Sequence, residues 1–343
     1  MNLQDLGWDD AFAASLEPHD NCIPARVSAQ HRGEYDVLTE RGELRVRVTG
    51  RLRHEAASAA DLPAVGDWVA LREETIQAVL PRRSAFARKV AWSQTEAQVL
   101  AANLDTVFVV SGLDGDFNLR RLERYLTLAW ESGATPALVL TKADLCEDVA
   151  RVLFEVEQVA LGVPVHVVSN VTGAGLDELL PYLAPARTIV LLGSSGVGKS
   201  TLANRLLGEE LQATKEIAED GRGRHTTTSR QLLRLAGGAL LVDTPGLREI
   251  QLWDADEGIQ EAFADVDELA ADCRFNDCAH MREPGCAVQA AIDEGRLPRE
   301  RLQSYRALQR ELLRLALKQD ARLRSEERKK WVAVARSRRK VSW

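Results

Sequence analysis

Short stretches of alternating apolar and polar residues follow one another between residues 22 and 90. Such alternation predicts β-strands with one buried face, and the sequences HRGE and ERGE between them predict tight turns. Five closely spaced strands indicate a small β-barrel, which fits an OB-fold, although the pattern alone does not exclude an SH3-like barrel. The predicted strands are 22–29, 35–40, 44–50, 67–71 and 75–80. We expect a barrel domain over residues 21–96, after a poorly structured extension of residues 1–20.

The pattern changes in the middle of the chain, where continuous apolar, β-rich runs are separated by helical segments. Strands that alternate with helices indicate a parallel sheet covered on both faces. We therefore predict an α/β domain over residues 97–252. Its predicted strands are 105–110, 136–141, 163–168, 188–192 and 239–242, and its predicted helices include 119–132 and 147–161.

The chain from residue 253 onward is helical and charged, which predicts a separate C-terminal domain over residues 253–343. A hydrophobic share of 45% and a charged share of 28% are ordinary for a soluble globular protein. The N-terminus does not resemble a signal peptide, and no apolar run is long enough to cross a membrane, so we expect a cytoplasmic protein without membrane contact. The net charge of −7 hides two basic stretches, 41–54 and 322–340, which indicate either contact with a polyanion or solvated faces.

A phosphate-binding loop is the strongest chemical signal. Residues 193–200, GSSGVGKS, match G-x-x-x-x-G-K-[ST] between a predicted strand and a predicted helix. In such a loop, backbone N–H groups and the helix N-terminus surround phosphates. Lys199 is predicted to act on the β- and γ-phosphates, and Ser200 to ligate Mg²⁺. The predicted nucleotide-binding residues here are Gly193, Ser194, Ser195, Gly196, Val197, Gly198, Lys199, Ser200 and Thr201.

Asp243 begins the sequence D-T-P-G at the end of the last predicted strand, where a carboxylate suits the Mg²⁺ site of a P-loop enzyme. The N–H of Gly246 would then face the γ-phosphate. Between the two motifs lies a loop rich in glycine and threonine, residues 221–228. We favour Thr227 among its threonines as a further Mg²⁺ ligand, of the kind that senses the γ-phosphate, and the alternative is a polar loop without a ligand role.

Leu247 occupies the position where Ras-type enzymes carry the glutamine that orients the attacking water. A leucine cannot polarise water, so another group must do so. The candidates are His225 and a group supplied by a partner. We therefore expect slow hydrolysis by the isolated chain.

Residues 141–144, TKAD, follow another predicted strand and suggest guanine recognition. The Asp144 carboxylate can accept from N1–H and the exocyclic amine of guanine, a donor pair that adenine lacks, while the Lys142 stem lies along the base. The alternative for Asp144 is a helix N-cap. The predicted base-binding residues are Thr141, Lys142 and Asp144, with Ser169 and Asn170 in a second loop.

These base-reading segments precede the P-loop, whereas they follow it in common GTPases, and no T/NKxD sequence occurs after Gly246. A single GTP site therefore requires a circularly permuted GTPase domain. Since D-T-P-G leads almost directly into the C-terminal domain, we hypothesise that nucleotide state changes the orientation of that domain. Matching small-angle scattering profiles with GDP and a non-hydrolysable GTP analogue would count against this.

Four metal-ligating residues lie within fourteen positions of the C-terminal domain, in the pattern Cys-x4-Cys-x-His-x5-Cys. Three thiolates and an imidazole fit a closed, structural Zn²⁺ site, and the alternative is a set of buried free cysteines. An odd total of five cysteines without a signal peptide argues against a disulfide framework. The predicted ligands are Cys273, Cys278, His280 and Cys286.

Together these motifs resemble the ribosome small subunit-dependent GTPase A family (RsgA, also called YjeQ). The resemblance rests on TKAD, GSSGVGKS, the RHTTT loop at 224–228, DTPGL at 243–247, the cysteine–histidine cluster and GDWV at 66–69. It implies an OB-fold, a circularly permuted GTPase domain and a zinc domain. One departure from GTPases generally is Thr141, where asparagine is commoner.

The resemblance also implies a function: a monomer that hydrolyses GTP to GDP, stimulated by the small (30S) ribosomal subunit, in late maturation near the decoding region of its 16S rRNA. It makes His225 a candidate for catalysis, together with Lys199. Two other functions remain open from the residues. One is an RNA-binding assembly factor that binds GTP but hardly hydrolyses it, and the other is a P-loop ATPase or small-molecule kinase, against which Asp144 argues.

Overall fold

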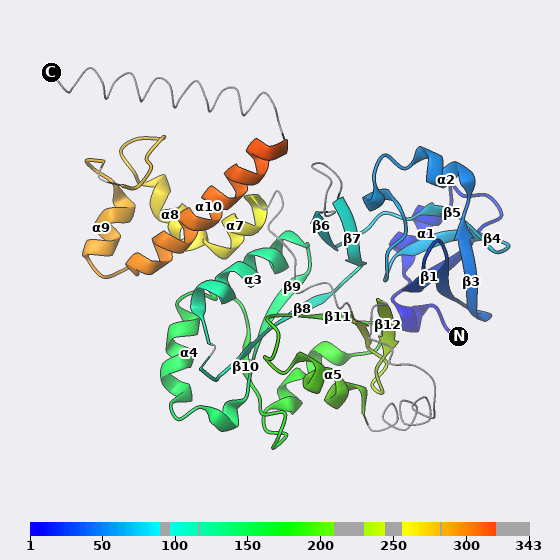
Figure 1. The fold of residues 1–343 in the computed structure, drawn as a ribbon, viewed down its shortest axis with the longest axis horizontal. Helices are drawn as coiled ribbons and strands as arrows, with labels where there is room; N and C mark the ends of the chain where they lie inside the picture. Colours follow the sequence, from blue (N-terminus) through cyan, green and yellow to red (C-terminus); the bar gives the residue numbers. More distant parts are fainter. Residues whose placement is uncertain (90–96, 116, 209–229, 244–255, 282, 320–343) are drawn as a thin grey trace.

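The computed structural model describes residues 1–89, 97–115, 117–208, 230–243, 256–281 and 283–319. Figure 1 shows a small barrel at one end, an α/β domain in the middle and a group of C-terminal helices at the other end. The arrangement agrees with the predicted fold class, in which a barrel precedes a P-loop domain and a cysteine–histidine domain follows it.

The N-terminal barrel has the five predicted strands, in the closed order β1-β2-β3-β5-β4-β1. Strands β3 and β5 are parallel and the other pairs are antiparallel, which gives a Greek-key barrel of the OB type. Alternate residues of β2 are buried, as the pattern predicts. The elements are β1 (Ile23–Gln30), β2 (Tyr35–Thr39), β3 (Gly42–Val48), α2 (Gly50–Glu55), η2 (Ala59–Asp61), β4 (Trp68–Arg72) and β5 (Thr75–Val79).

The first twenty residues form ordered structure, so the prediction of a poorly structured extension is wrong. They contain the turn η1 (Gln4–Leu6) and the helix α1 (Asp10–Leu16), which Asp9 caps by accepting from two backbone N–H groups. The Trp8 ring lies 4.7 Å from the ring of Trp68, which is itself buried in the core. The segment is too short to show a helical period, and its apolar residues are ordered by burial against the barrel.

The central sheet has the order β10-β9-β8-β11-β13-β12. Its first five strands are parallel, but β12 is antiparallel to β13, so the prediction of a parallel sheet is wrong at this strand. We did not predict β12, which has only four residues. The strands are β8 (Thr106–Gly112), β9 (Thr135–Thr141), β10 (Val165–Val167), β11 (Thr188–Leu192), β12 (Gln231–Arg234) and β13 (Leu240–Asp243).

Helices cover both faces of this sheet, as predicted. Val107 and Val109 of β8 belong to one apolar core, while Phe108 and Val110 belong to another. This alternation explains why the strands read as continuous apolar runs. The helical elements are α3 (Leu119–Glu131), η3 (Ala143–Leu145), α4 (Val149–Glu157), η4 (Leu176–Leu183) and α5 (Lys199–Leu207).

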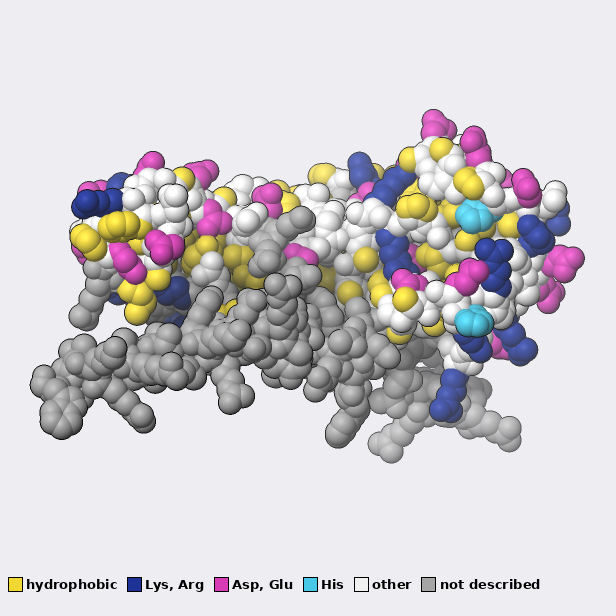
Figure 2. Space-filling view, turned by 90° about the horizontal axis from the view of Figure 1, so that it is seen from above, with side chains coloured by type: hydrophobic (Ala, Val, Ile, Leu, Met, Phe, Trp, Pro, Cys, Tyr) yellow, Lys and Arg dark blue, Asp and Glu magenta, His cyan; other side chains and the backbone are white. Residues whose placement is uncertain are grey.

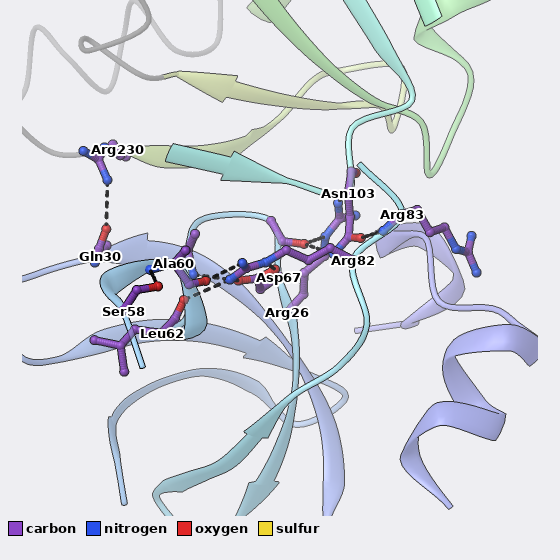
Figure 3. Close-up of polar contacts among 12 residues, drawn as sticks. Arg26, Gln30, Ser58, Ala60, Leu62, Asp67, Arg82, Arg83, Asn103 and Arg230 are labelled. Carbon is purple, nitrogen blue, oxygen red and sulfur yellow. Dashed lines mark hydrogen bonds and ion pairs between the residues drawn. The ribbon is translucent and has the colours of Figure 1, made fainter. Parts of the chain in front are cut away.

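The barrel is joined to the central sheet by a polar junction (Figure 3). On the barrel side of this junction, the carboxylate of Asp67 accepts from Arg82 Nε at 2.8 Å and Nη2 at 2.7 Å. The guanidinium of Arg26, which is 1% exposed, donates to Thr188 Oγ1 at 2.8 Å, at the start of β11. Gln231 of β12 also pairs with Ala29 of β1. The two strands β6 (Ala85–Lys89) and β7 (Ala97–Ala102), which we did not predict, form an antiparallel pair between the two domains.

Four helices form the described part of the C-terminal domain, and two of them pack against α3 (Figure 1). Gly258 allows the closest approach, because a Cβ there would lie 2.5 Å from the carbonyl oxygen of Thr127. No helix among the described residues is long and apolar enough to cross a membrane. The helices are α7 (Asp256–Ala262), α8 (Ala264–Ala271), α9 (Ala287–Asp293) and α10 (Arg299–Gln319).

Candidate nucleotide site and metal cluster

The predicted P-loop connects the end of β11 to the start of α5. Gly196 and Gly198 have φ angles of 82° and 95°, which a residue with a side chain rarely adopts. Gly193 is required for space, because a Cβ there would lie 2.2 Å from the carbonyl oxygen of Val110 in β8. Ser200 and Thr201 are exposed in the first turn of the helix. The strand, loop and helix thus form the shape that the motif needs for phosphate binding.

The ammonium group of Lys199 lies against its own loop. It donates to the carbonyl oxygen of Gly193 at 2.7 Å and also to that of Ser194. The hydroxyl of Ser194 is 3.1 Å from the hydroxyl of Tyr125 in α3. These contacts hold the only lysine of the loop within the curve of its backbone, so Lys199 is positioned to act on the phosphates that the loop would enclose.

The two loops predicted to read the base contact the P-loop, although they lie before it in the sequence. The hydroxyl of Thr141, which is fully buried, donates to the carbonyl oxygen of Val197. The amide of Asn170 donates to the carbonyl oxygen of Gly198 at 3.3 Å. Parallel pairing of β8 with both β9 and β11 brings these loops to one sheet edge. Thr141 therefore braces the P-loop.

Asp144 is held by the second base-reading loop. The hydroxyl of Ser169 donates to Asp144 Oδ1 at 2.5 Å, and the Ser169 hydroxyl also accepts from the N–H of Thr172 at 3.1 Å. The alternative role of Asp144 as a helix N-cap is not realised, because Asp148 caps α4. An exposed carboxylate with one oxygen fixed in this way can accept hydrogen bonds from a planar donor pair.

Lys142, beside Asp144, has a partner that we did not predict. Its ammonium group forms an ion pair with Asp114, which follows β8. Asp114 could have been found by its position, because it is a carboxylate just beyond the carboxyl end of a parallel strand. Tyr125 carries no such signal, since it lies inside a helix and belongs to no motif.

The predicted Mg²⁺ ligands are only partly within the described structure. Asp243 is the exposed last residue of β13, and the pairing of Val190 with Val242 places it at the same sheet edge as the P-loop and Ser200. Thr227, His225, Gly246 and Leu247 lie outside the described residues, as does the basic stretch 322–340. The sheet edge thus combines a helix N-terminus, a lysine, a hydroxyl and carboxylates, which is the chemistry of a nucleotide–magnesium site.

The four predicted zinc ligands meet between α8 and α9, with their ligand atoms all within 4.8 Å of one another. His280 Nδ1 lies 3.6 Å from the sulfurs of both Cys273 and Cys286, and these two sulfurs are 3.9 Å apart. Tetrahedral Zn²⁺ would separate sulfurs by about 3.8 Å, and sulfur from nitrogen by about 3.5 Å, given its usual bond lengths. The residues therefore fit a metal ion.

The imidazole of the cluster is prepared for ligation. Burial and the nearby charge of Arg306 lower the pKa of His280, which favours the neutral form of the ring. The carbonyl oxygen of His280 accepts from the side chains of Gln289 and Arg306, which fixes the backbone of this residue. A neutral ring nitrogen and thiolates are the forms that bind Zn²⁺.

The basic stretch of the barrel is more mixed in charge than its sequence indicates. Figure 2 shows Lys and Arg side chains interspersed with acidic ones over the barrel end of the molecule. Arg45 pairs with Asp36 at 2.7 Å, and Arg51 with Glu55 at 2.8 Å. The two arginine side chains are still 59% and 84% exposed. Exposed ion pairs contribute little, so these arginines can exchange their carboxylate partners for phosphates.

Comparison with known proteins gives a consistent result. Residues 79–253 match the family model described as RsgA GTPase. The chain is 50% identical to the small ribosomal subunit biogenesis GTPase RsgA of Opitutus terrae, over 99% of this chain and 97% of that protein. It is 51% identical to the small ribosomal subunit biogenesis GTPase RsgA 2 of Lactiplantibacillus plantarum, over 91% of this chain and 90% of that protein.

Two solved structures have the same fold. YjeQ from Thermotoga maritima superposes with a TM-score of 0.63 at 27% identity, covering 85% of this chain and 99% of that one. YloQ, whose structure is described as a circularly permuted GTPase, superposes with a TM-score of 0.61 at 24% identity, over 86% of this chain and 96% of that one. The permuted order of motifs is therefore a property of a known fold.

Proposed function

Because the chain belongs to the RsgA GTPase family, we propose that it hydrolyses GTP to GDP and phosphate on the small (30S) ribosomal subunit, during late maturation of that subunit. The observation that carries this proposal is the contact between the base-reading loops and the P-loop. Thr141 and Asn170 both donate to P-loop carbonyl oxygens, so one nucleotide can be read at its base and its phosphates together.

The proposed binding roles divide between the two halves of the site. Asp144, oriented by Ser169, accepts from the N1–H and exocyclic amine of guanine, and Lys142 lies along the base. Residues 193–201 enclose the phosphates, with Lys199 on the β- and γ-phosphates. Guanine specificity follows from Asp144, because adenine offers no equivalent donor pair.

Bound Mg²⁺ would neutralise the charge that develops on the β- and γ-phosphate oxygens. The residues that would hold it are Ser200, Asp243 and Thr227. In the chemical step, the attacking water must be oriented in line with the bond to the leaving GDP. Since Leu247 cannot do this, the proposal assigns the task to His225 or to a group supplied by the subunit, which explains why hydrolysis would depend on a partner.

The remaining parts of the chain are proposed to hold the subunit. In this division, residues 1–20 form an N-terminal segment, 21–96 the barrel domain, 97–252 the GTPase domain and 253–343 the zinc domain. The exposed arginines of the barrel would contact 16S rRNA through phosphates, so binding should weaken as salt rises. A Zn²⁺ ion held by Cys273, Cys278, His280 and Cys286 would stabilise the fold of the last domain. We propose a cytoplasmic monomer.

The test is GTP hydrolysis by the purified chain, alone and with purified small subunits, large subunits or free rRNA. The proposal predicts slow turnover alone, strong stimulation by small subunits only, and loss of both activities in Lys199→Ala. If small subunits bind but do not stimulate, the chain is instead an RNA-binding assembly factor that uses GTP only as a ligand. If no ribosomal component binds or stimulates, the ribosomal assignment is refuted.

A further inference from the structure

Helix α3 connects the C-terminal domain to the P-loop, and each connection uses a different face of the helix. Five of its residues contact the C-terminal domain, and their spacing places them within one face of a helix with 3.6 residues per turn. These residues are Arg120, Glu123, Arg124, Thr127 and Glu131. Tyr125 lies on another face, where its hydroxyl is 3.1 Å from that of Ser194 in the P-loop.

The contacts on the first face are strong for an interface between domains. Arg301 of α10 donates to Glu123 Oε1 at 2.9 Å, and the two side chains are 1% and 3% exposed. Arg124 pairs with both carboxylate oxygens of Glu311, at 2.6 Å and 2.9 Å. A buried pair and a bidentate pair fix both the position and the rotation of α3 relative to α10.

The contact on the second face reaches the lysine of the nucleotide site. Ser194 bonds to Tyr125 through its hydroxyl and accepts from Lys199 through its carbonyl oxygen. A small rotation of α3 would therefore displace the residue that holds Lys199. From these contacts we infer that Tyr125 is a positioning residue of the nucleotide site, through which the docked C-terminal domain is coupled to the P-loop.

This inference rests on the proposed GTP site. It adds Tyr125, which belongs to no motif, and a chain of contacts that leads from the C-terminal domain through α3 to the P-loop. The first test is the dissociation constant of a fluorescent GDP for the full chain and for Tyr125→Phe, Ser194→Ala and the double variant. Loss of one hydrogen bond predicts roughly two- to tenfold weaker binding in each single variant. The double variant should bind GDP at least as tightly as the single variant with the lower affinity, because both changes remove the same contact.

Tyr182→Phe is the matched control. It also removes a tyrosine hydroxyl, but this hydroxyl is bonded to His166 Nε2 at 3.0 Å and not to the P-loop. Its GDP affinity should equal that of the wild type, and thermal unfolding should show that all variants are folded. Unchanged affinity in Tyr125→Phe, or effects that multiply in the double variant, would overturn the inference. A wild-type chain that binds no GDP would instead refute the proposed site itself.

The second test addresses the coupling to the C-terminal domain. Glu311→Ala removes the pair with Arg124, which is about one-third exposed on each side, so the fold should survive. We expect faster GDP dissociation in this variant, and no further increase when it is combined with Tyr125→Phe. Glu155→Ala, which removes an exposed pair with Arg151 on α4, is the control and should leave the rate unchanged. If Glu311→Ala speeds GDP dissociation by the same factor in the wild type and in Tyr125→Phe, the coupling is contradicted.

Discussion

Replacing Thr141 by valine tests whether the base-reading loop braces the P-loop. Valine has nearly the volume and shape of threonine but no hydroxyl, so Thr141→Val removes the short bond to the carbonyl oxygen of Val197, and a longer one of 3.3 Å to that of Ser111, without creating a cavity. Thr141 is fully buried and Val197 is 4% exposed, so water cannot readily replace the lost donor. The main perturbation is therefore the buried, unsatisfied carbonyl group of Val197, the nearer of the two acceptors, at the junction of the two halves of the site.

The magnitude follows from the cost of such a group. An unsatisfied buried acceptor costs about 1–3 kcal/mol, and a tenfold change in affinity corresponds to about 1.4 kcal/mol. Part of this cost appears in the stability of the free protein, since the carbonyl is unpaired there as well. The rest appears in binding, because the nucleotide must order a loop that is no longer held. We expect GTP binding to weaken by about tenfold.

Isothermal titration of GTP into the wild type, Thr141→Val and Thr141→Ser gives the comparison. Serine keeps the hydroxyl and loses the methyl group, so it controls for packing at this position. Thr141→Ser should bind GTP as the wild type does, even if its thermal unfolding occurs at a lower temperature. Equal GTP affinities in the valine and serine variants would refute the brace.

Three further outcomes are expected. In Ser169→Ala, Asp144 loses the hydroxyl that orients it, so GTP binding should weaken by roughly two- to tenfold. A competition titration should also show a reduced preference for GTP over ATP. An unchanged preference would show that Ser169 is not needed to orient Asp144. Elemental analysis should find about one zinc ion per wild-type chain and none in Cys286→Ser, which should also unfold at a lower temperature. Equal zinc content in the two proteins would rule out the cluster as the site. Glu123→Gln should lower the free energy of unfolding in urea by about 1.5 kcal/mol, because Arg301 stays buried with one fewer charged partner but keeps its pair with Asp265, and an unchanged midpoint would contradict this.

The sequence predicted the elements that have a long hydrophobic pattern or lie next to a motif. The five barrel strands, the apolar strands β8, β9 and β11 and the helix after the P-loop were all indicated by period or by position next to a motif. The four residues of the candidate metal site were found because these rare residue types lie close together in the chain. In each case the signal is local, so one chain segment contains all of it.

The parts that were missed depend on contacts between distant segments. The first twenty residues are ordered by Trp68 and the rest of the barrel, and the strand β12, which links the central sheet to β1, is only four residues long. The partners Asp114 and Tyr125 are specified by the packing of α3 and β8 against the site. Tertiary context of this kind leaves no periodic pattern in the sequence, and the tyrosine in particular resembles any other half-buried residue of a helix.

The central claim is that two chain segments in reversed order form one guanine-nucleotide site. Competition of GTP, ATP and XTP against a fluorescent GTP analogue, for the wild type and Asp144→Asn, tests it most directly. We predict that GTP but not ATP displaces the analogue from the wild type. In Asp144→Asn, GTP binding should weaken at least tenfold, about 1.4 kcal/mol, while XTP, with a carbonyl in place of the amine, binds better than before. Equal displacement by ATP and GTP, or a GTP affinity that Asp144→Asn leaves unchanged, would contradict the claim.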